Sequence, residues 1–211
     1  MADDTAHIYE PAQGHGLRHD PFNAIVGPRP IGWVSSIDAA GVANLAPYSF
    51  FNAFNYKPPI IGFSTIGWKD SVANIAATGM FCWNLATKAL AERMNLTCAP
   101  APAEIDEFDV AGLTRAPSRR IAAPRVLESP VNFECRLAQL IQLQSADGEA
   151  VDTWLVLGEV VTIWIDRACI REGLYDTAAA HPILRAGRLG DYAEITPEAM
   201  FEMPRPGWPI D

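Results

Sequence analysis

The sequence predicts a mostly β fold of the α+β class, an antiparallel β-barrel with a few short helices. Apolar and polar residues alternate in segments 29–37 and 131–143, which is typical of half-buried strands. The 17 prolines and 15 glycines among 211 residues indicate many turns and few long helices. With 49% apolar and 19% charged residues, the chain has the composition of a globular domain with a substantial core.

Charge and hydropathy exclude several classes of function. The formal net charge is −9, from 16 basic and 25 acidic residues, so no basic field favours a nucleic-acid partner. The longest apolar run, residues 154–165, is too short to span a membrane and contains Gly158 and Glu159. Residues 1–7 contain neither a basic nor an apolar stretch, so no secretory signal is expected. We therefore expect a cytoplasmic protein without a membrane partner.

The four cysteines are far apart and form no CxxC pair. They are expected to be free thiols: Cys82, Cys98, Cys135 and Cys169. His15 and His19 have the i,i+4 spacing of a metal-binding pair, but they lie in a polar segment beside Gly14 and Gly16. A solvated segment is the favoured interpretation, and we expect no metal site.

The N-terminal half alternates strands and short helices. Residues 1–20 are expected to be an irregular extension, and the first strand covers residues 29–37. It ends at Asp38-Ala-Ala-Gly41, a hairpin-type loop. The next elements are expected in this order: a strand 42–45, a strand 58–65 with its prolines first, a helix 72–78 capped by Asp70 or Ser71, a strand 80–85, a helix 88–96 and a short acidic helix 103–108.

Two long strands dominate the C-terminal half. In the strand 131–143, the side chains of Asn132 and Glu134 are expected on the polar face. Asp147-Gly148 predicts a tight turn into the strand 151–165, which is apolar on both faces. Because both faces need cover, we expect a homodimer. The predicted domain limits are an extension at 1–20, a barrel domain at 21–170 and a loop-rich tail at 171–211, packed on the barrel or the partner subunit.

One segment of the N-terminal half predicts an anion site. Gly67-Trp-Lys-Asp-Ser71 places a lysine and a hydroxyl at a helix start, where free N–H groups favour a phosphate. Lys69 is one of three lysines, and hydroxyl residues such as Ser35 and Ser64 end two neighbouring strands. The alternative is ordinary capping of the helix by Asp70 or Ser71.

A second segment, Asn44-Leu-Ala-Pro-Tyr-Ser-Phe-Phe-Asn52, follows small residues with aromatic ones. This pattern would suit a planar ring that needs main-chain donors at its edge and apolar cover on its face. An aromatic part of the barrel core is the alternative. The sequence contains no GxGxxG motif after a strand, no GxxxxGK[ST] and no GxSxG.

Four segments then occur in a fixed order: Pro28-Arg-Pro-Ile-Gly-Trp-Val-Ser-Ser36, Asn44-Leu-Ala-Pro-Tyr-Ser-Phe-Phe-Asn52, Pro58-Pro-Ile-Ile-Gly-Phe-Ser64 and Lys69-Asp-Ser-Val-Ala-Asn-Ile75. Shorter matches are Asp106-Glu-Phe108, Glu128-Ser-Pro130, Gly158-Glu-Val160 and Pro182-Ile-Leu-Arg185. This ordered set resembles the flavin reductase-like family, in the branch of nitrilotriacetate monooxygenase component B-like proteins. The resemblance implies an FMN-binding split β-barrel, a homodimer with the flavin near its interface, and electron transfer from NADH or NADPH to flavin, often for a partner monooxygenase.

The resemblance also implies site residues. The segment 46–49 would meet the edge of the isoalloxazine ring through its main chain, and hydroxyl and basic side chains would hold the ribityl and phosphate end. The implied cofactor-binding residues are Ala46, Pro47, Tyr48 and Ser49 at the ring, Ser35, Ser64, Lys69 and Ser71 at the ribityl and phosphate end, and Arg29 beside them. No catalytic acid or base is predicted, because the flavin carries the chemistry.

The sequence departs from the family at one place. Two-component reductases of the family carry a Gly-Asp-His motif that handles the pyridine nucleotide, and this chain has Gly158-Glu159-Val160. The leading hypothesis is an NAD(P)H:flavin oxidoreductase, in which His181 could replace the missing imidazole. The alternatives are a flavin-binding electron carrier that does not oxidise NAD(P)H and a purely structural dimerisation barrel.

Overall fold

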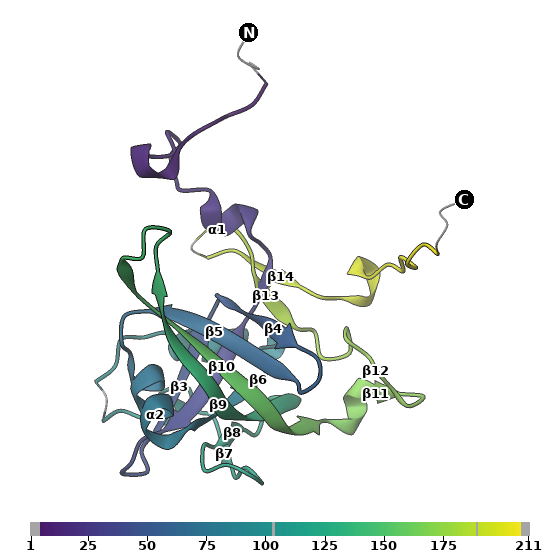
Figure 1. Ribbon diagram of the computed structural model, residues 1–211. Helices are drawn as coiled ribbons and strands as arrows, with labels where there is room; N and C mark the ends of the chain where they lie inside the picture. The colour runs from purple at the N-terminus through teal and green to yellow at the C-terminus, as the bar shows by residue number, and fades with distance from the viewer. Residues whose placement is uncertain (1–4, 103, 189, 208–211) are drawn as a thin grey trace.

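The computed structural model describes residues 5–102, 104–188 and 190–207, and a seven-stranded sheet curled into a half-barrel forms its centre (Figure 1). The strand order is β3-β2-β6-β9-β10-β5-β4, and every pairing is antiparallel. The strands are β2 (Gly32–Ile37), β3 (Ala43–Tyr48), β4 (Phe51–Asn55), β5 (Ile60–Ile66), β6 (Met80–Asn84), β9 (Val131–Gln144) and β10 (Ala150–Ile165). The predicted fold class, an antiparallel split barrel with few helices, is confirmed.

Shorter strands and helices accompany the seven-stranded sheet. The short strands are β1 (Arg29–Pro30), β13 (Ile183–Arg185) and β14 (Tyr192–Glu194) in one sheet, and the pairs β7 (Arg115–Ala116) with β8 (Arg125–Val126) and β11 (Ile170–Arg171) with β12 (Leu174–Tyr175). The helices are α1 (Phe22–Ile25), α2 (Asp70–Thr78), α3 (Ala91–Leu96) and α4 (Glu107–Val110). Four 3₁₀ turns complete the chain: η1 (Pro11–Gln13), η2 (Lys88–Leu90), η3 (Arg167–Cys169) and η4 (Pro197–Ala199).

The sheet separates two hydrophobic clusters. Side chains alternate across a strand, so Trp33 and Val34, neighbours in β2, lie in different clusters. The cluster of Val34 also contains Phe63 and Phe81, whose rings meet edge to face at 5.9 Å. The cluster of Trp33 contains Phe108 of α4, so this short helix is fixed to the sheet by a fully buried ring.

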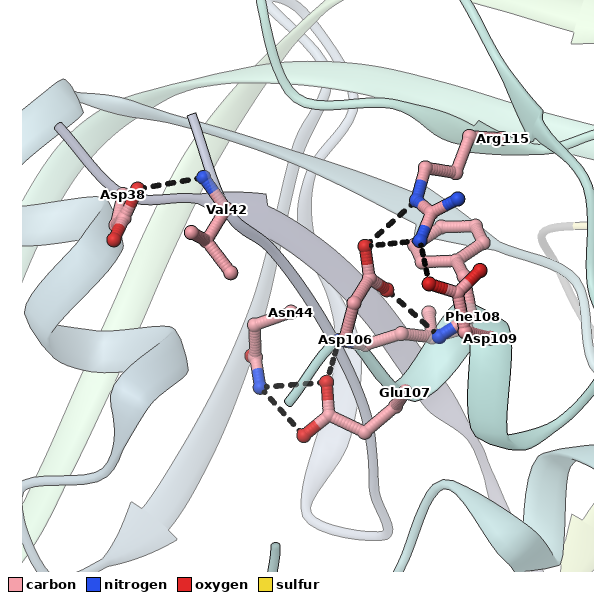
Figure 2. Close-up of polar contacts among 9 residues, drawn as sticks. Asp38, Val42, Asn44, Asp106, Glu107, Phe108, Asp109 and Arg115 are labelled. Carbon is pink, nitrogen blue, oxygen red and sulfur yellow. Dashed lines mark hydrogen bonds and ion pairs between the residues drawn. The ribbon is translucent and has the colours of Figure 1, made fainter. Parts of the chain in front are cut away.

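Several expected elements are found with shifted ends. The strand β4 was not predicted, and the short acidic helix expected at 103–108 is α4, which begins at Glu107. Residue 103 lies outside the described residues. The hairpin loop at Asp38 is confirmed, because its Oδ1 accepts the Ala40 N–H at 2.9 Å. It also accepts the Val42 N–H at 2.7 Å (Figure 2). The four cysteines are free, as expected, and Cys98 is the exposed one.

The polar face predicted for the start of β9 is wrong. Asn132 and Glu134 are almost fully buried, because β8 covers Asn132 and the segment between β7 and β8 covers Glu134. The Glu134 carboxylate accepts the main-chain N–H groups of Arg119 and Arg120 at 2.8 and 2.6 Å, and the Trp164 indole N–H at 2.6 Å. A polar residue in an alternating strand can therefore bind a distant loop instead of water.

The segment after residue 170 contributes strands to the fold. β13 pairs with β1, with Arg185 opposite Arg29, and β14 pairs with β13. The domain limits at residues 20 and 170 stay a prediction. In the part of the chain that the structure describes, no helix has the length and apolar character needed to cross a membrane.

Candidate functional site

The strand β3 lies at one edge of the sheet and would expose unpaired main-chain groups there. The Glu107 carboxylate covers this edge. It accepts the Leu45 main-chain N–H at 2.9 Å and the Asn44 side-chain amide at 3.1 and 3.2 Å, one distance to each oxygen (Figure 2). Burial raises the pKa of the Glu107 carboxyl, and the hydrogen bond from Leu45 opposes this rise.

The helix α4 that carries Glu107 spans four residues, too few to be stable alone. Its N-cap, Asp106, accepts the Phe108 N–H at 2.8 Å. Arg115 holds Asp106 at 2.6 Å and Asp109 at 2.7 Å, and its guanidinium lies over the Phe108 ring (Figure 2). These contacts fix the position of the Glu107 side chain.

A cavity of about 510 Å³ lies beside β3. The start of α2, the segment 97–101 and Glu107 form its other walls. A second cavity, of about 220 Å³, shares Pro47, Tyr48 and Cys98 with the first and reaches Arg185 and Tyr192. Together they have the size of a cofactor site.

The start of α2 differs from the expected capping. The N-cap is Lys69, whose side chain makes no capping hydrogen bond, so the interpretation of Asp70 or Ser71 as the cap is wrong. The Ser71 hydroxyl instead donates to Asn44 Oδ1 at 2.7 Å. The helix therefore presents its first N–H groups and its positive dipole end next to an exposed lysine at the cavity.

The nine predicted cofactor-binding residues do not all meet at one place. Five of them line the larger cavity: Ala46, Pro47, Tyr48, Lys69 and Ser71. Ser49 lines the adjoining smaller one. Arg29 and Ser64 line a separate cavity of about 570 Å³, together with Phe50 and Phe51.

Arg29 is occupied by main-chain carbonyls. Its guanidinium donates to the carbonyl oxygens of Asn23 and Val26, and to that of Ser49 at 3.0 Å. It also lies over the Phe50 ring, 5.4 Å from the ring centroid. Arg29 thereby ties the segment before β1 to the end of β3.

Ser35 must be corrected as a predicted cofactor contact. It does not line either of the two cavities beside β3 and is fully buried in β2. Its hydroxyl donates a hydrogen bond to the Pro124 carbonyl oxygen and accepts one from the Asn84 side-chain amide at 3.2 Å. The segment before β8 thus covers the strand end that the sequence suggested was open.

Sequence reasoning missed Asn44 and Glu107 as wall residues of the cavity. Both belonged to recognised segments, but neither was assigned a role. The signal that could have found Glu107 is an acidic pair before Phe108 in a stretch rich in proline and alanine, since such a carboxylate needs a buried donor.

Other candidate groups lie elsewhere. His181 lines none of the described cavities, and its Nδ1 bonds to the Glu194 carboxylate at 2.8 Å. An apolar cavity of about 320 Å³ lies between β4 and the segment around Pro182 and contains Trp83 and Phe133. Within the described ranges, no three His, Cys, Asp or Glu side chains are grouped so that they could hold a metal ion.

A sequence model described as a flavin reductase like domain matches residues 27–183. The chain belongs to the flavin reductase-like family. Membership in this family implies a flavin cofactor and assigns the chain to the flavin-related oxidoreductases. The cavity beside β3 fits that cofactor, because it combines a lysine and a helix start at one end with apolar and main-chain surface at the other.

Individual proteins are similar to this chain in sequence or in structure. An uncharacterized protein of Aquifex aeolicus is 36% identical over 155 residues, which are 71% of this chain and 76% of that protein. Nitrilotriacetate monooxygenase component B from Bacillus cereus has a TM-score of 0.79 and 29% identity, over 86% of this chain and 90% of that one. The 2-nitrobenzoate 2-nitroreductase of Pseudomonas fluorescens has a TM-score of 0.77 and 29% identity, over 87% and 88%.

The pH dependence of the unfolding free energy tests whether Tyr48 is buried in the cavity wall. Burial raises the pKa of the Tyr48 phenol to about 12. Between about pH 10 and 12 the unfolded phenol loses its proton and the folded one keeps it. The stabilisation that comes from the buried Tyr48 phenol is therefore fully present below about pH 10, and it is lost as the pH rises toward 12.

We expect Tyr48→Phe to make the fall of the unfolding free energy shallower by roughly 1.4 kcal/mol per pH unit in this range. Denaturant unfolding at several pH values measures this slope. Tyr56→Phe, at a tyrosine that is 83% exposed, controls for the loss of one hydroxyl. A slope in Tyr48→Phe equal to that of the wild type would contradict the buried phenol.

Proposed function

We propose that the protein is an FMN-binding oxidoreductase that transfers electrons from NAD(P)H to flavin. The observation that carries the proposal is the pair of joined cavities beside β3, with Lys69 and the start of α2 at one end. An FMN phosphate fits that end, and the isoalloxazine ring fits the wall formed by Pro47, Tyr48 and Ser49.

Only some main-chain N–H groups along β3 are available to donate a hydrogen bond to the edge of the isoalloxazine ring. Alternate residues of an edge strand direct their N–H groups outward, and Leu45 directs its own to Glu107. The next outward position in β3 is Pro47, which has no N–H, and Ser49 is the first residue after the strand. Ser49 is therefore the proposed main-chain donor for the ring edge.

The protein supplies binding, orientation and exclusion of water. When bound, the flavin accepts a hydride and passes electrons on. Ile31, Tyr48 and Met94 provide apolar surface in the smaller cavity, which keeps water from the ring. A main-chain donor at the ring edge would stabilise negative charge that develops there.

Anaerobic stopped-flow mixing of the FMN-loaded protein with NADH or NADPH tests the proposed donor. We expect flavin absorbance near 450 nm to bleach at a rate that saturates with nucleotide concentration. A protein that is colourless, does not bind added FMN and does not oxidise NAD(P)H would contradict the proposal.

The second candidate function is a flavin-binding electron carrier. At the place of the family's Gly-Asp-His motif, Glu159 is exposed and Val160 is buried, so no imidazole stands there. His181 is bonded to Glu194 and lines neither of the two joined cavities beside β3. FMN that is reduced by a partner protein but not by NAD(P)H would favour the carrier, and fast direct reduction would exclude it.

We further propose a homodimer in the cytoplasm. Four apolar side chains of β9 and β10 are exposed by 38% to 50%: Ile141, Val151, Ile163 and Ile165. A second copy would cover them. Sedimentation velocity is expected to give twice the chain mass of 23.0 kDa, and a monomer at micromolar concentration would contradict the dimer.

The partner that receives reduced flavin is proposed to be a monooxygenase. The structural similarity to a protein named as a monooxygenase component supports this, at 29% identity.

Lys69 gives the sharpest test of the phosphate end. Lys69→Ala is expected to weaken FMN binding by about 1–3 kcal/mol, because a charge-assisted contact is lost. Riboflavin, which lacks the phosphate, should bind as before. Flavin fluorescence titration measures both affinities, with Lys88→Ala as the control at an exposed lysine of η2. Equal losses for FMN and riboflavin would place Lys69 away from the phosphate.

A further inference from the structure

A chain of buried hydrogen bonds forms one wall of the proposed flavin cavity. It runs from Glu107 through Asn44 to Ser71. The exposed fractions of these residues are 7%, 9% and 1%. All three line the cavity of about 510 Å³, and its walls bring them together from α4, β3 and α2.

The charge of Glu107 sets the direction of this chain. An ionised carboxylate only accepts hydrogen bonds, and both of its oxygens lie within 3.2 Å of the same Asn44 nitrogen. The Leu45 N–H is a further donor to the same carboxylate. The amide of Asn44 must therefore turn its NH₂ group toward Glu107 and its oxygen toward Ser71.

The orientation of the Asn44 amide also determines which partner donates in its hydrogen bond with Ser71. Its oxygen lies 2.7 Å from Asn44 Oδ1, which can only accept, so the single Ser71 proton is used in this bond. Toward the cavity, Ser71 then offers lone pairs alone. A phosphate oxygen is also an acceptor and gains nothing from it, whereas a sugar hydroxyl can donate to it.

We infer that Glu107 is a positioning residue for the flavin cavity: acting through Asn44, it holds the Ser71 hydroxyl as an acceptor, so that Ser71 serves a ribityl hydroxyl and not the phosphate. The inference rests on the proposed flavin site and assigns its subsites. The phosphate is left to Lys69 and the first N–H groups of α2. Glu107 thereby lowers the preference of the site for FMN over riboflavin.

Glu107→Gln tests the inference by reversing the chain. The glutamine puts an NH₂ group in place of one carboxylate oxygen, where it opposes the Asn44 NH₂ and favours the turned-over Asn44 amide. Ser71 then receives a hydrogen bond from Asn44, and its own proton becomes free for the phosphate. We expect the affinity ratio of FMN to riboflavin, measured by fluorescence titration, to rise about tenfold.

Two comparisons separate this role from a simple charge effect. Asp109→Asn removes a carboxylate from the same helix, where the side chain pairs with Arg115 and not with Asn44, and should leave the ratio within about twofold. Glu107→Gln combined with Ser71→Ala should lose the whole rise. A rise that persists without the Ser71 hydroxyl would show repulsion by Glu107 alone and would overturn the positioning role.

Ser71→Ala in the otherwise unchanged protein keeps the inference testable even if the Gln variant does not fold. The FMN to riboflavin ratio should stay within about twofold of the wild type, because Ser71 gives no proton to the phosphate. A tenfold fall would show a Ser71 donor and overturn the inference. Glu107→Asp, which keeps the charge, is expected to keep the wild-type ratio.

The outcomes also distinguish a failure of the proposed flavin-binding function from a failure of the positioning role of Glu107. A wild-type protein that binds neither flavin contradicts the proposed function, and the positioning role falls with it. Normal binding of both flavins with an unchanged ratio in a folded Glu107→Gln variant contradicts the positioning role alone. Circular dichroism and thermal unfolding establish that each variant is folded.

Discussion

The interaction on which the site depends is the hydrogen bond between the Glu107 carboxylate and the main chain of β3. An edge strand has unpaired N–H groups that otherwise need water or another strand. Glu107 satisfies one of them at Leu45 and, through Asn44, reaches the start of α2. Arg115 and Asp106 hold Glu107 in place. The wall of the cavity is thus built from contacts between segments far apart in the sequence.

The net charge of −9 does not conflict with an anionic cofactor. Interactions with distant surface charges are screened within about 10 Å at 0.1 M salt, so the local groups decide. The cavity has an exposed lysine and a helix start that no side chain caps. Both favour a phosphate at short range. The same cavity contains the Glu107 carboxylate, and this makes the hydrogen-bond direction at Ser71 matter for selectivity.

The sequence predicts what depends on local periodicity. The alternation in β9, the two apolar faces of β10 and the turn between them follow from residue order, and so does the helix after Lys69. The positions of Ala46, Pro47 and Tyr48 at the cavity agree with the recognised segment. What could not be predicted depends on long-range contacts. The sequence alone indicates that the polar side chains of Ser35 and Glu134 are accessible to solvent, but the segment between β7 and β8 covers both.

The central claim is that the joined cavities beside β3 hold FMN with its phosphate at Lys69. A crystal structure of the protein grown with FMN tests this most directly. The account predicts the phosphate within hydrogen-bonding distance of the Lys69 ammonium and the ring against Pro47 and Ser49. A ring bound instead in the apolar cavity around Trp83 and Phe133, with the cavity beside β3 holding only water, would contradict it.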